Sequence, residues 1–277
     1  MKTKLRVAGA GVTALALVYT FGYSGLVATE YRSATASVAE RFIPLPELDK
    51  VDYNARLLAL AHIASTTEVF STASTSVSVI STTTPSLWPV STVYPNADAI
   101  LPFKRIVAYY GNFYSRGMGV LGQYPTDQML AMLASTTAMW ATADPSTPVL
   151  PAIHYIVAVA QASAGKEGKY ILRMPDDQID HALDLAKRVH GIVFLDVQVA
   201  LSTLQHELPM IEKYLKMPNV HLAIDPEFSM KHNERPGTVI GTFDAVDINY
   251  ATDYLARIVR ENHLPPKVLV VHRFTGD

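Results

Sequence analysis

Short apolar runs alternate with longer amphipathic stretches from Lys104 onward. Five runs of four or five mostly apolar residues have the composition of strands: 106–110, 149–153, 192–195, 220–224 and 268–271. Nearly continuous apolar strands are typical of parallel sheets, because both faces of such a sheet are covered. The pattern therefore predicts five buried parallel strands.

The stretches between these strands have helical periodicity. Two of them place apolar side chains on a single helical face: Ile179, Ala182, Leu183, Ala186 and Val189 in one, and Ile248, Ala251, Leu255, Ile258 and Val259 in the other. Asp244 is a good N-cap for the last helix. Ser202 and Gln205 resemble a capping box, and Pro209 is expected to kink or restart the helix that they begin.

The alternation of strands and helices along the chain is compatible with two architectures, a doubly wound sheet and a (β/α)8 barrel. Polar residues decide between them, because they collect where successive strands end: Tyr109, Tyr110, Asn112, His154, Gln161, Asp196, Gln198, Asp225, Glu227 and His272. Such a ring is typical of the catalytic face of a barrel. We therefore expect an α/β fold of the (β/α)8 TIM-barrel type over residues 104–277.

The expected barrel is incomplete. Only about five βα units are visible, whereas a barrel has eight units in about 250 residues. An open arc of five strands would leave apolar edges uncovered. We expect either a truncated reading of a longer protein or a partner that completes the barrel.

Residues 1–36 form a signal peptide or membrane anchor in our interpretation. Lys2, Lys4 and Arg6 precede a segment, 7–28, without a charged residue. That segment would form a helix about 33 Å long, enough to cross a bilayer core of about 30 Å. Cleavage after the small residues 34–36 is the alternative. Either way the rest of the chain faces outward or is secreted, by the positive-inside rule.

Two segments separate this anchor from the barrel. Residues 37–64 contain Pro44 and Pro46 and a helix expected to begin near Asp52. Residues 65–103 are rich in Ser and Thr over most of their length and suggest a spacer. A β-hairpin insertion is the alternative, because several β-branched residues occur there.

Composition and charge exclude several classes of protein. The chain has 277 residues, of which 49% are apolar and 17% charged, and its net charge is -2. This composition argues against disorder throughout. Basic residues number 23 against 25 acidic ones, which argues against a nucleic-acid partner. The absence of cysteine excludes disulfides, thiolate metal sites and a cysteine nucleophile.

Several motifs resemble those of a known family. They are Tyr109-Tyr-Gly-Asn-Phe-Tyr, Gly117-Met-Gly-Val-Leu-Gly-Gln-Tyr-Pro125, Phe194-Leu-Asp-Val-Gln198, His221-Leu-Ala-Ile-Asp-Pro-Glu-Phe228 and Val270-Val-His-Arg-Phe-Thr275. Together they resemble a family of largely uncharacterised exported bacterial barrel proteins, over about residues 104–277. The resemblance implies a fold and an export route but no reaction. This chain lacks the lipobox cysteine of such lipoproteins and has Asn112 where many relatives have His.

Asp225-Pro226-Glu227 carries the most specific chemical signal. Alternate strand residues face the same way, so both carboxylates can point into the barrel mouth, where Asp196 joins them from the neighbouring strand. Carboxylates in proximity repel, so one is expected to have a raised pKa and to serve as a general acid. Glycosidases use such a pair. The alternative is structural, with Asp225 capping a loop and Glu227 paired with Lys231 or Arg235.

Other candidate chemistry is weaker. Gly117-x-Gly119-x-x-Gly122 lacks the strand and acidic residue of a dinucleotide site, so we expect no nucleotide. We expect no metal or other cofactor, because no His-x-His or His-Glu-x-x-His motif occurs. A site of His154 and His272 with Asp225 or Glu227 remains the alternative.

These observations predict an exported, membrane-tethered glycoside hydrolase that acts on envelope or extracellular glycans. Glu227 would be the general acid, and Asp225 or Asp196 the nucleophile or base. Polar and aromatic residues would bind the glycan: Tyr109, Tyr110, Asn112, His154, Gln161, Gln198 and His272. The alternatives are a glycan-binding module without activity and a metal-dependent hydrolase.

Overall fold

The computed structural model describes residues 47–60 and 93–274, all of which belong to one compact unit, Pro44–Asp277. The expected anchor, residues 1–36, and most of the Ser/Thr-rich segment lie outside the described residues. Within the described ranges, no helix combines the length and the apolar character needed to span a bilayer.

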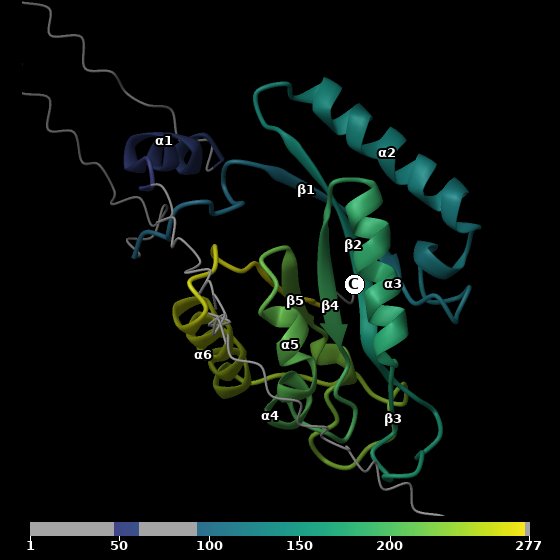
Figure 1. Ribbon diagram of the computed structural model, residues 1–277. Coiled ribbons are helices and arrows are strands. Elements are labelled where there is room, and N and C mark those ends of the chain that lie inside the picture. Colours follow the sequence, from purple (N-terminus) through teal and green to yellow (C-terminus); the bar gives the residue numbers. More distant parts are fainter. Residues whose placement is uncertain (1–46, 61–92, 275–277) are drawn as a thin grey trace, which may run out of the picture. The chain divides into compact units, whose positions relative to one another are not determined.

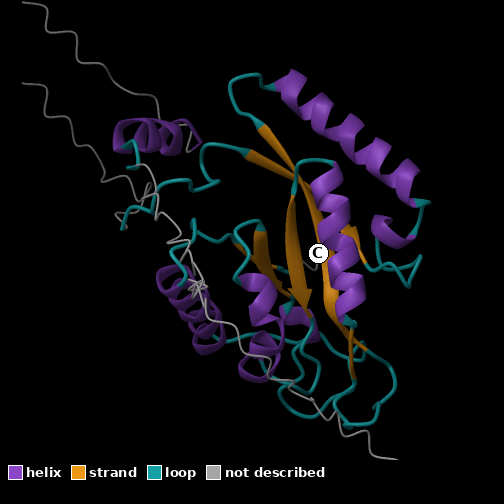
Figure 2. Ribbon diagram, in the orientation of Figure 1, coloured by secondary structure: helices purple, strands orange, loops and turns teal. Residues whose placement is uncertain are grey.

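Five parallel strands form one sheet in the order β1-β2-β4-β5-β6 (Figure 1). They are β1 (Arg105–Gly111), β2 (Val149–Ala160), β4 (Ile192–Val197), β5 (Val220–Ile224) and β6 (Leu269–Val271). A short strand, β3 (Ile171–Arg173), pairs antiparallel with the end of β2. The strands alternate with helices along the chain, and the sheet curls into a half barrel (Figure 2). These features confirm the expected parallel α/β architecture.

Helix α1 precedes the first strand, and the other helices alternate with the strands along the chain. The helices are α1 (Lys50–Leu60), α2 (Thr126–Ala143), α3 (Asp176–Arg188), α4 (Leu204–Glu207), α5 (Glu212–Leu215) and α6 (Ala245–Glu261), with short 3-10 turns η1 (Val120–Gly122), η2 (Leu208–Ile211) and η3 (Pro226–Phe228). The cap at Asp244 is confirmed, because Asp244 and Asp247 form a capping box at α6. Pro209 lies in η2, where the chain leaves α4, as expected.

The larger core lies between the outer face of the sheet and helices α2 to α6. Outward strand residues such as Tyr155, Leu195 and Leu222 are fully buried there against helical residues such as Leu133 and Ile258. Alternate residues of each strand point to this face, because side chains in a strand alternate between faces. The amphipathic helices therefore cover the sheet on its outer side.

The inner face of the sheet carries a smaller core and a hollow. Ile192 and Phe194 pack there with Ala152 and Ala223. The same part of the inner face borders a cavity of about 1150 Å³, which residues of α1 also line. Helices α2 to α6 thus shield only the outer face, and the inner face is left for the side chains that project into the curl.

Two elements were not located from the sequence, and one strand is longer than expected. Strand β2 continues to Ala160, seven residues beyond the predicted run, and β3 is too short to have a pattern. An ion pair holds β3 in place: Arg173 binds both oxygens of the buried Glu207 in α4, at 2.7 and 2.8 Å. Helix α2 was not located because its apolar positions have weak periodicity.

Glycines let the loop after β1 fold back onto the strand. Gly119 has φ 104° and ψ 176°, a region essentially restricted to glycine. A Cβ atom at Gly119 would collide with the carbonyl oxygen of Tyr110, and one at Gly111 would lie 2.7 Å from the carbonyl oxygen of Met118. These glycines therefore serve packing of the loop, consistent with the interpretation that Gly117-x-Gly119-x-x-Gly122 is no dinucleotide motif.

Substitution of Gly119 tests this close approach. We expect Gly119→Ala to lower the free energy of unfolding by about 3 kcal/mol, from backbone strain and collision together. Gly237 is the matched control, because it also has positive φ, +80°, but no atom lies within 4 Å of its Cβ position. Gly237→Ala should cost only about 1 kcal/mol. Urea denaturation measures both, and equal losses would contradict the packing argument.

Candidate functional site

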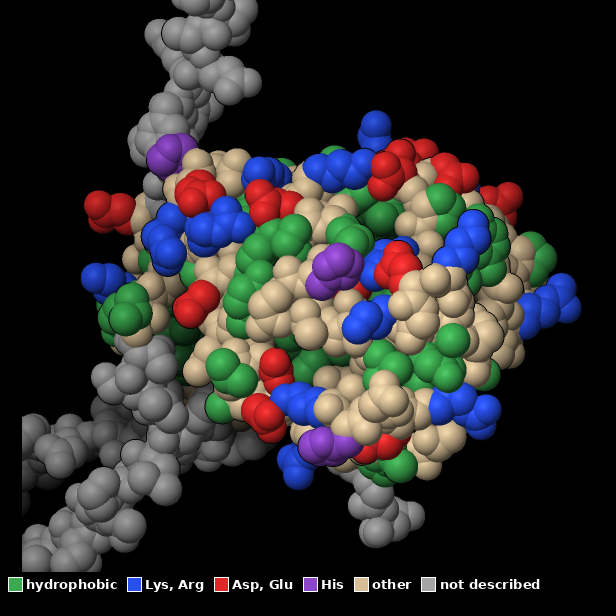
Figure 3. Space-filling model, turned by 90° about the horizontal axis from the view of Figure 1, so that it is seen from below, with side chains coloured by type: hydrophobic (Ala, Val, Ile, Leu, Met, Phe, Trp, Pro, Cys, Tyr) green, Lys and Arg blue, Asp and Glu red, His purple; other side chains and the backbone are tan. Residues whose placement is uncertain are grey.

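The carboxyl ends of the parallel strands meet at one edge of the sheet. Figure 3 looks toward this edge from below, and there basic, acidic, histidine and hydrophobic side chains are interspersed. Four of the expected residues project from strands or strand ends on the inner face: His154 from β2, Asp196 from β4, Asp225 after β5 and His272 after β6. Asp225 and His272 line the pocket at this edge, and His154 and Asp196 are buried beside them.

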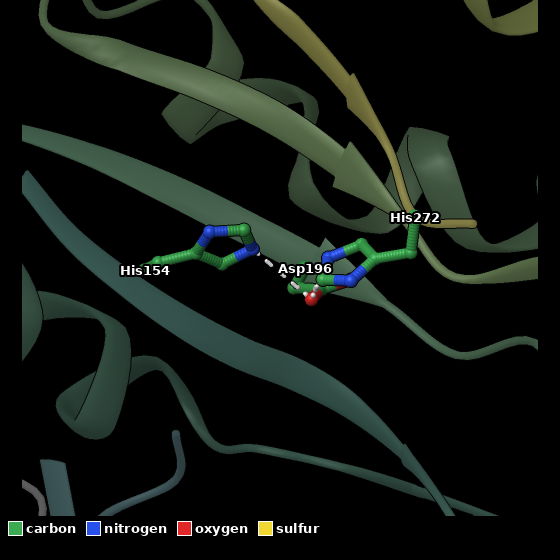
Figure 4. A group of neighbouring side chains, drawn as sticks. All are labelled: His154, Asp196 and His272. Atoms are coloured by element: carbon green, nitrogen blue, oxygen red, sulfur yellow. Dashed lines mark hydrogen bonds and ion pairs between the residues drawn. The ribbon is translucent and has the colours of Figure 1, made fainter. Parts of the chain in front are cut away.

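His154, Asp196 and His272 form a tight cluster (Figure 4). The Nε2 atom of His154 lies 3.1 Å from Oδ2 of Asp196, in a hydrogen bond. The Nε2 atom of His272 lies 3.0 Å from the same oxygen. The two imidazole rings approach the carboxylate from opposite sides (Figure 4). One carboxylate oxygen thus contacts two ring nitrogens.

The register of the strands explains how these three residues meet. His154 is paired with Phe194, so Asp196 lies two residues further along the same face of β4. Strand β5 separates β4 from β6, and Ala223 on β5 is paired with both Asp196 and Val270. A methyl group at position 223 leaves room above it, so His272 reaches across β5 to Asp196.

Burial and charge act in opposite directions on this cluster. Asp196 is fully buried. Burial acts to raise the pKa of Asp196, but the contacts with His154 and His272 outweigh it and hold the pKa below its usual value. The contact with Asp196 raises the pKa of His272 although burial opposes this. The cluster therefore favours an ionised Asp196.

Asp225 lies beside this cluster in a different environment. It is 4% exposed, and its Oδ2 accepts a hydrogen bond of 3.0 Å from Nε2 of Gln198. The Oε1 atom of Gln198 in turn accepts from the backbone of Ala160 at 3.0 Å, which fixes the orientation of the amide. Burial and the neighbouring Asp196 raise the pKa of Asp225 to about 6. Asp225 thus keeps its proton to a higher pH than a solvated aspartate does.

A pocket of about 580 Å³ opens at this site. Its lining includes five of the residues expected from the sequence: Tyr110, Gln198, Asp225, Glu227 and His272. Tyr110 contacts His154 edge-on, with ring centroids 5.1 Å apart. Burial and the carboxylates of Asp196 and Asp225 raise the pKa of the Tyr110 hydroxyl, which is therefore neutral. The pocket brings a neutral hydroxyl, an amide and two carboxyl groups together.

Five lining residues were missed by the sequence analysis: Ile156 and Ala160 belong to β2, and the other three lie outside the strands. Met118 belongs to the loop after β1, Phe228 to η3, and Arg273 follows His272. Their positions in loops next to strand ends were the only available signal. Loop residues that line a pocket cannot be separated by pattern from those that face solvent.

Three expected residues lie elsewhere. The hydroxyl group of Tyr109 bonds to Thr136 of α2 at 2.9 Å, on the outer side of the sheet. Asn112 is buried, and its amide donates to the Ile156 carbonyl and accepts from the Tyr114 amide, each at 2.9 Å. Gln161 is half-buried at the end of β2 and does not line the pocket. Asn112 thus stabilises the loop.

The structural alternative for Glu227 receives little support. Lys231, one of its two possible partners, bonds instead to Asp244 and Asp247, at 2.5 Å each. Glu227 is half-buried in the wall of the pocket. Its carboxyl group therefore faces the same space as Asp225.

Comparisons with known proteins give no further assignment: the chain matches no protein-family model, no curated protein and no solved structure.

Asp225→Asn tests the environment of Asp225. A pKa raised from 3.8 to about 6 means that the folded protein binds a proton more tightly than the unfolded chain. The wild type therefore loses stability as pH rises from about 4 to 6, by up to about 3 kcal/mol. Asparagine carries no charge and keeps an acceptor for Gln198. The variant should match the wild type at pH 4 and exceed it at pH 7, measured by urea denaturation. A gain that is independent of pH would contradict the raised pKa.

Proposed function

We propose that this protein is an exported hydrolase of (β/α)-barrel architecture that cleaves glycosidic bonds in envelope or extracellular glycans. The observation that carries the proposal is the pair of carboxyl groups, Asp225 and Glu227, that line one pocket in different environments. Two titratable groups whose surroundings separate their protonation states are the arrangement that acid and base catalysis requires.

In this proposal Asp225 is the general acid, and Glu227 is the general base or the nucleophile. Asp225 is the more buried of the two and has a pKa of about 6, so it can hold a proton for the leaving group. Glu227 is half-buried and more open to water. This assignment exchanges the roles that the sequence alone suggested. Asp196 is not a nucleophile in this scheme, because one of its carboxylate oxygens contacts both His154 and His272.

The reaction would proceed with both carboxyl groups at the scissile bond. Asp225 would donate its proton to the leaving glycosidic oxygen as the bond from that oxygen to the anomeric carbon breaks. Glu227 would either take a proton from the attacking water or attack the anomeric carbon itself. In the second case water later cleaves the glycosyl ester, and Asp225 takes the proton of that water.

The remaining pocket residues suit a hydroxyl-rich ligand. Tyr110 supplies a flat apolar ring with a neutral hydroxyl group, the combination that packs on sugar rings and bonds to them. Gln198 positions Asp225, because both ends of its amide are held. Arg273 at the rim adds donors for hydroxyl or carboxylate groups of a glycan.

Export and membrane attachment are the part of the proposal that rests on residues 1–36. Their basic start and the uncharged segment 7–28 support a membrane anchor or a signal peptide. The pocket would then face the extracytoplasmic space, where envelope glycans occur.

Glycan hydrolysis by two variants tests the proposal. We expect Asp225→Asn and Glu227→Gln each to lower kcat at least about 100-fold. The first variant lacks the proton donor, and the second lacks the base or nucleophile. Release of reducing sugar from peptidoglycan, chitooligosaccharides and β-glucans measures this. In the wild type, kcat/KM should fall as pH rises above about 6, where Asp225 loses its proton.

Asp253→Asn is the matched control, because Asp253 is an exposed carboxylate on α6. It should retain wild-type kcat. Activity in Asp225→Asn equal to that of the wild type would overturn the proposed acid. Glycan binding by the wild type without release of reducing sugar would instead favour the non-catalytic binding module.

A further inference from the structure

The cluster of His154, Asp196 and His272 is not used in the proposed hydrolysis. Asp196 is fully buried, yet its Oδ1 atom has no hydrogen-bond partner among the described residues. The Nε2 atom of His272 likewise makes no hydrogen bond of acceptable geometry there, although it lies 3.0 Å from Asp196 Oδ2. Buried polar atoms without partners are costly, so this arrangement requires an explanation.

We propose that His154, Asp196 and His272 form a binding site for one divalent transition-metal ion, such as Zn²⁺. Each residue offers one ligand atom, and the three atoms lie within 4.8 Å of one another. Two imidazole nitrogens and one carboxylate oxygen form a donor set that catalytic zinc sites and non-haem iron sites use.

Two of the three separations between the donor atoms suit such an ion, and the third is within 4.8 Å. Bonds from zinc to nitrogen or oxygen are about 2.0–2.2 Å long, so neighbouring ligand atoms lie about 3.0–3.5 Å apart. The two nitrogen-to-oxygen distances in the cluster are 3.1 and 3.0 Å. Small side-chain rotations would place the three donors around one ion, and the backbone of the strands need not move.

The charge of the cluster also favours a cation. The Asp196 carboxyl group is fully buried, and its nearest basic partners are two histidines that contact the same oxygen. A divalent ion would balance the carboxylate and at the same time accept the lone pair of each deprotonated Nε2 atom. Imidazole nitrogens favour zinc, iron or cobalt over magnesium and calcium, which prefer oxygen ligands.

The position of the cluster leaves one side of the ion accessible. Asp196 is fully buried, whereas His272 is half-buried and lines the same pocket as Asp225 and Glu227. Three protein ligands with an accessible coordination position are typical of catalytic rather than structural zinc sites. The accessible position would face the pocket, where water or a substrate oxygen can complete the coordination.

Metal binding and the proposed glycan hydrolysis are tested separately. The metal ligands are three residues other than the acid pair, and the metal test measures binding, so either proposal can fail without the other. If both hold, the ion lies beside the acid pair and can polarise a substrate oxygen as a Lewis acid.

Titration of the full chain with Zn²⁺ and Co²⁺, after treatment with a chelator, tests the site. We expect one ion per chain by isothermal titration calorimetry and a visible absorption spectrum for the Co²⁺ form. Asp196→Asn and His272→Gln should each weaken binding about 100-fold or more, because each removes or neutralises one of three ligands. Asparagine is isosteric with Asp196, and His272 lies at a strand end, so both variants should fold. If one of them does not fold, the other still tests the site.

His206→Gln is the matched control, since His206 is exposed in α4 and outside the cluster. It should bind one ion with wild-type affinity, and circular dichroism should confirm that all variants are folded. Wild-type protein that binds neither Zn²⁺ nor Co²⁺ at a one-to-one ratio would overturn the proposal. So would a folded Asp196→Asn variant with wild-type affinity, and the cluster would then be a hydrogen-bonded pair of histidines around a buried carboxylate.

Discussion

Helices α2 to α6 pack against one face of the parallel sheet, and the rest of the structure depends on this constraint. Right-handed crossovers carry successive helices to the same side when the strand order runs in one direction, as it does from β1 to β6. The sheet then curls away from the helices, and its inner face becomes concave. Side chains on the concave face converge, so residues from strands that are not neighbours can meet.

Small side chains decide which residues meet. Ala223 on β5 lies between Asp196 and His272, and Ala152 on β2 lies below His154 on the same face. A larger residue at position 223 would fill the space that the imidazole of His272 crosses. The cluster of His154, Asp196 and His272 thus requires a small side chain at position 223 as well as the three polar residues.

Burial on the inner face shifts the pKa of its titratable groups. Burial raises the pKa of Asp225 to about 6 and lowers the pKa of His221 to about 3, so both neutral forms are favoured. Asp196 behaves differently because two histidines contact it, and these contacts outweigh its burial. Ionised Asp196 next to protonated Asp225 would give the site one fixed charge and one exchangeable proton.

The sequence by itself determined the five parallel strands, the cap of α6, the amphipathic faces of α3 and α6, and most of the residues at the strand ends, because hydrophobic periodicity and capping are local properties. It placed the cap of α4 one residue early, because Thr203 rather than Ser202 caps that helix. It placed Tyr109, Asn112 and Gln161 beside Tyr110 and His154 because all follow strands. Only the tertiary structure separated them: the face of β1 that carries Tyr109 is the one that α2 covers, and loop hydrogen bonds occupy Asn112. The contact of His154, Asp196 and His272 likewise required the curl and register of strands distant in sequence, which no local pattern encodes.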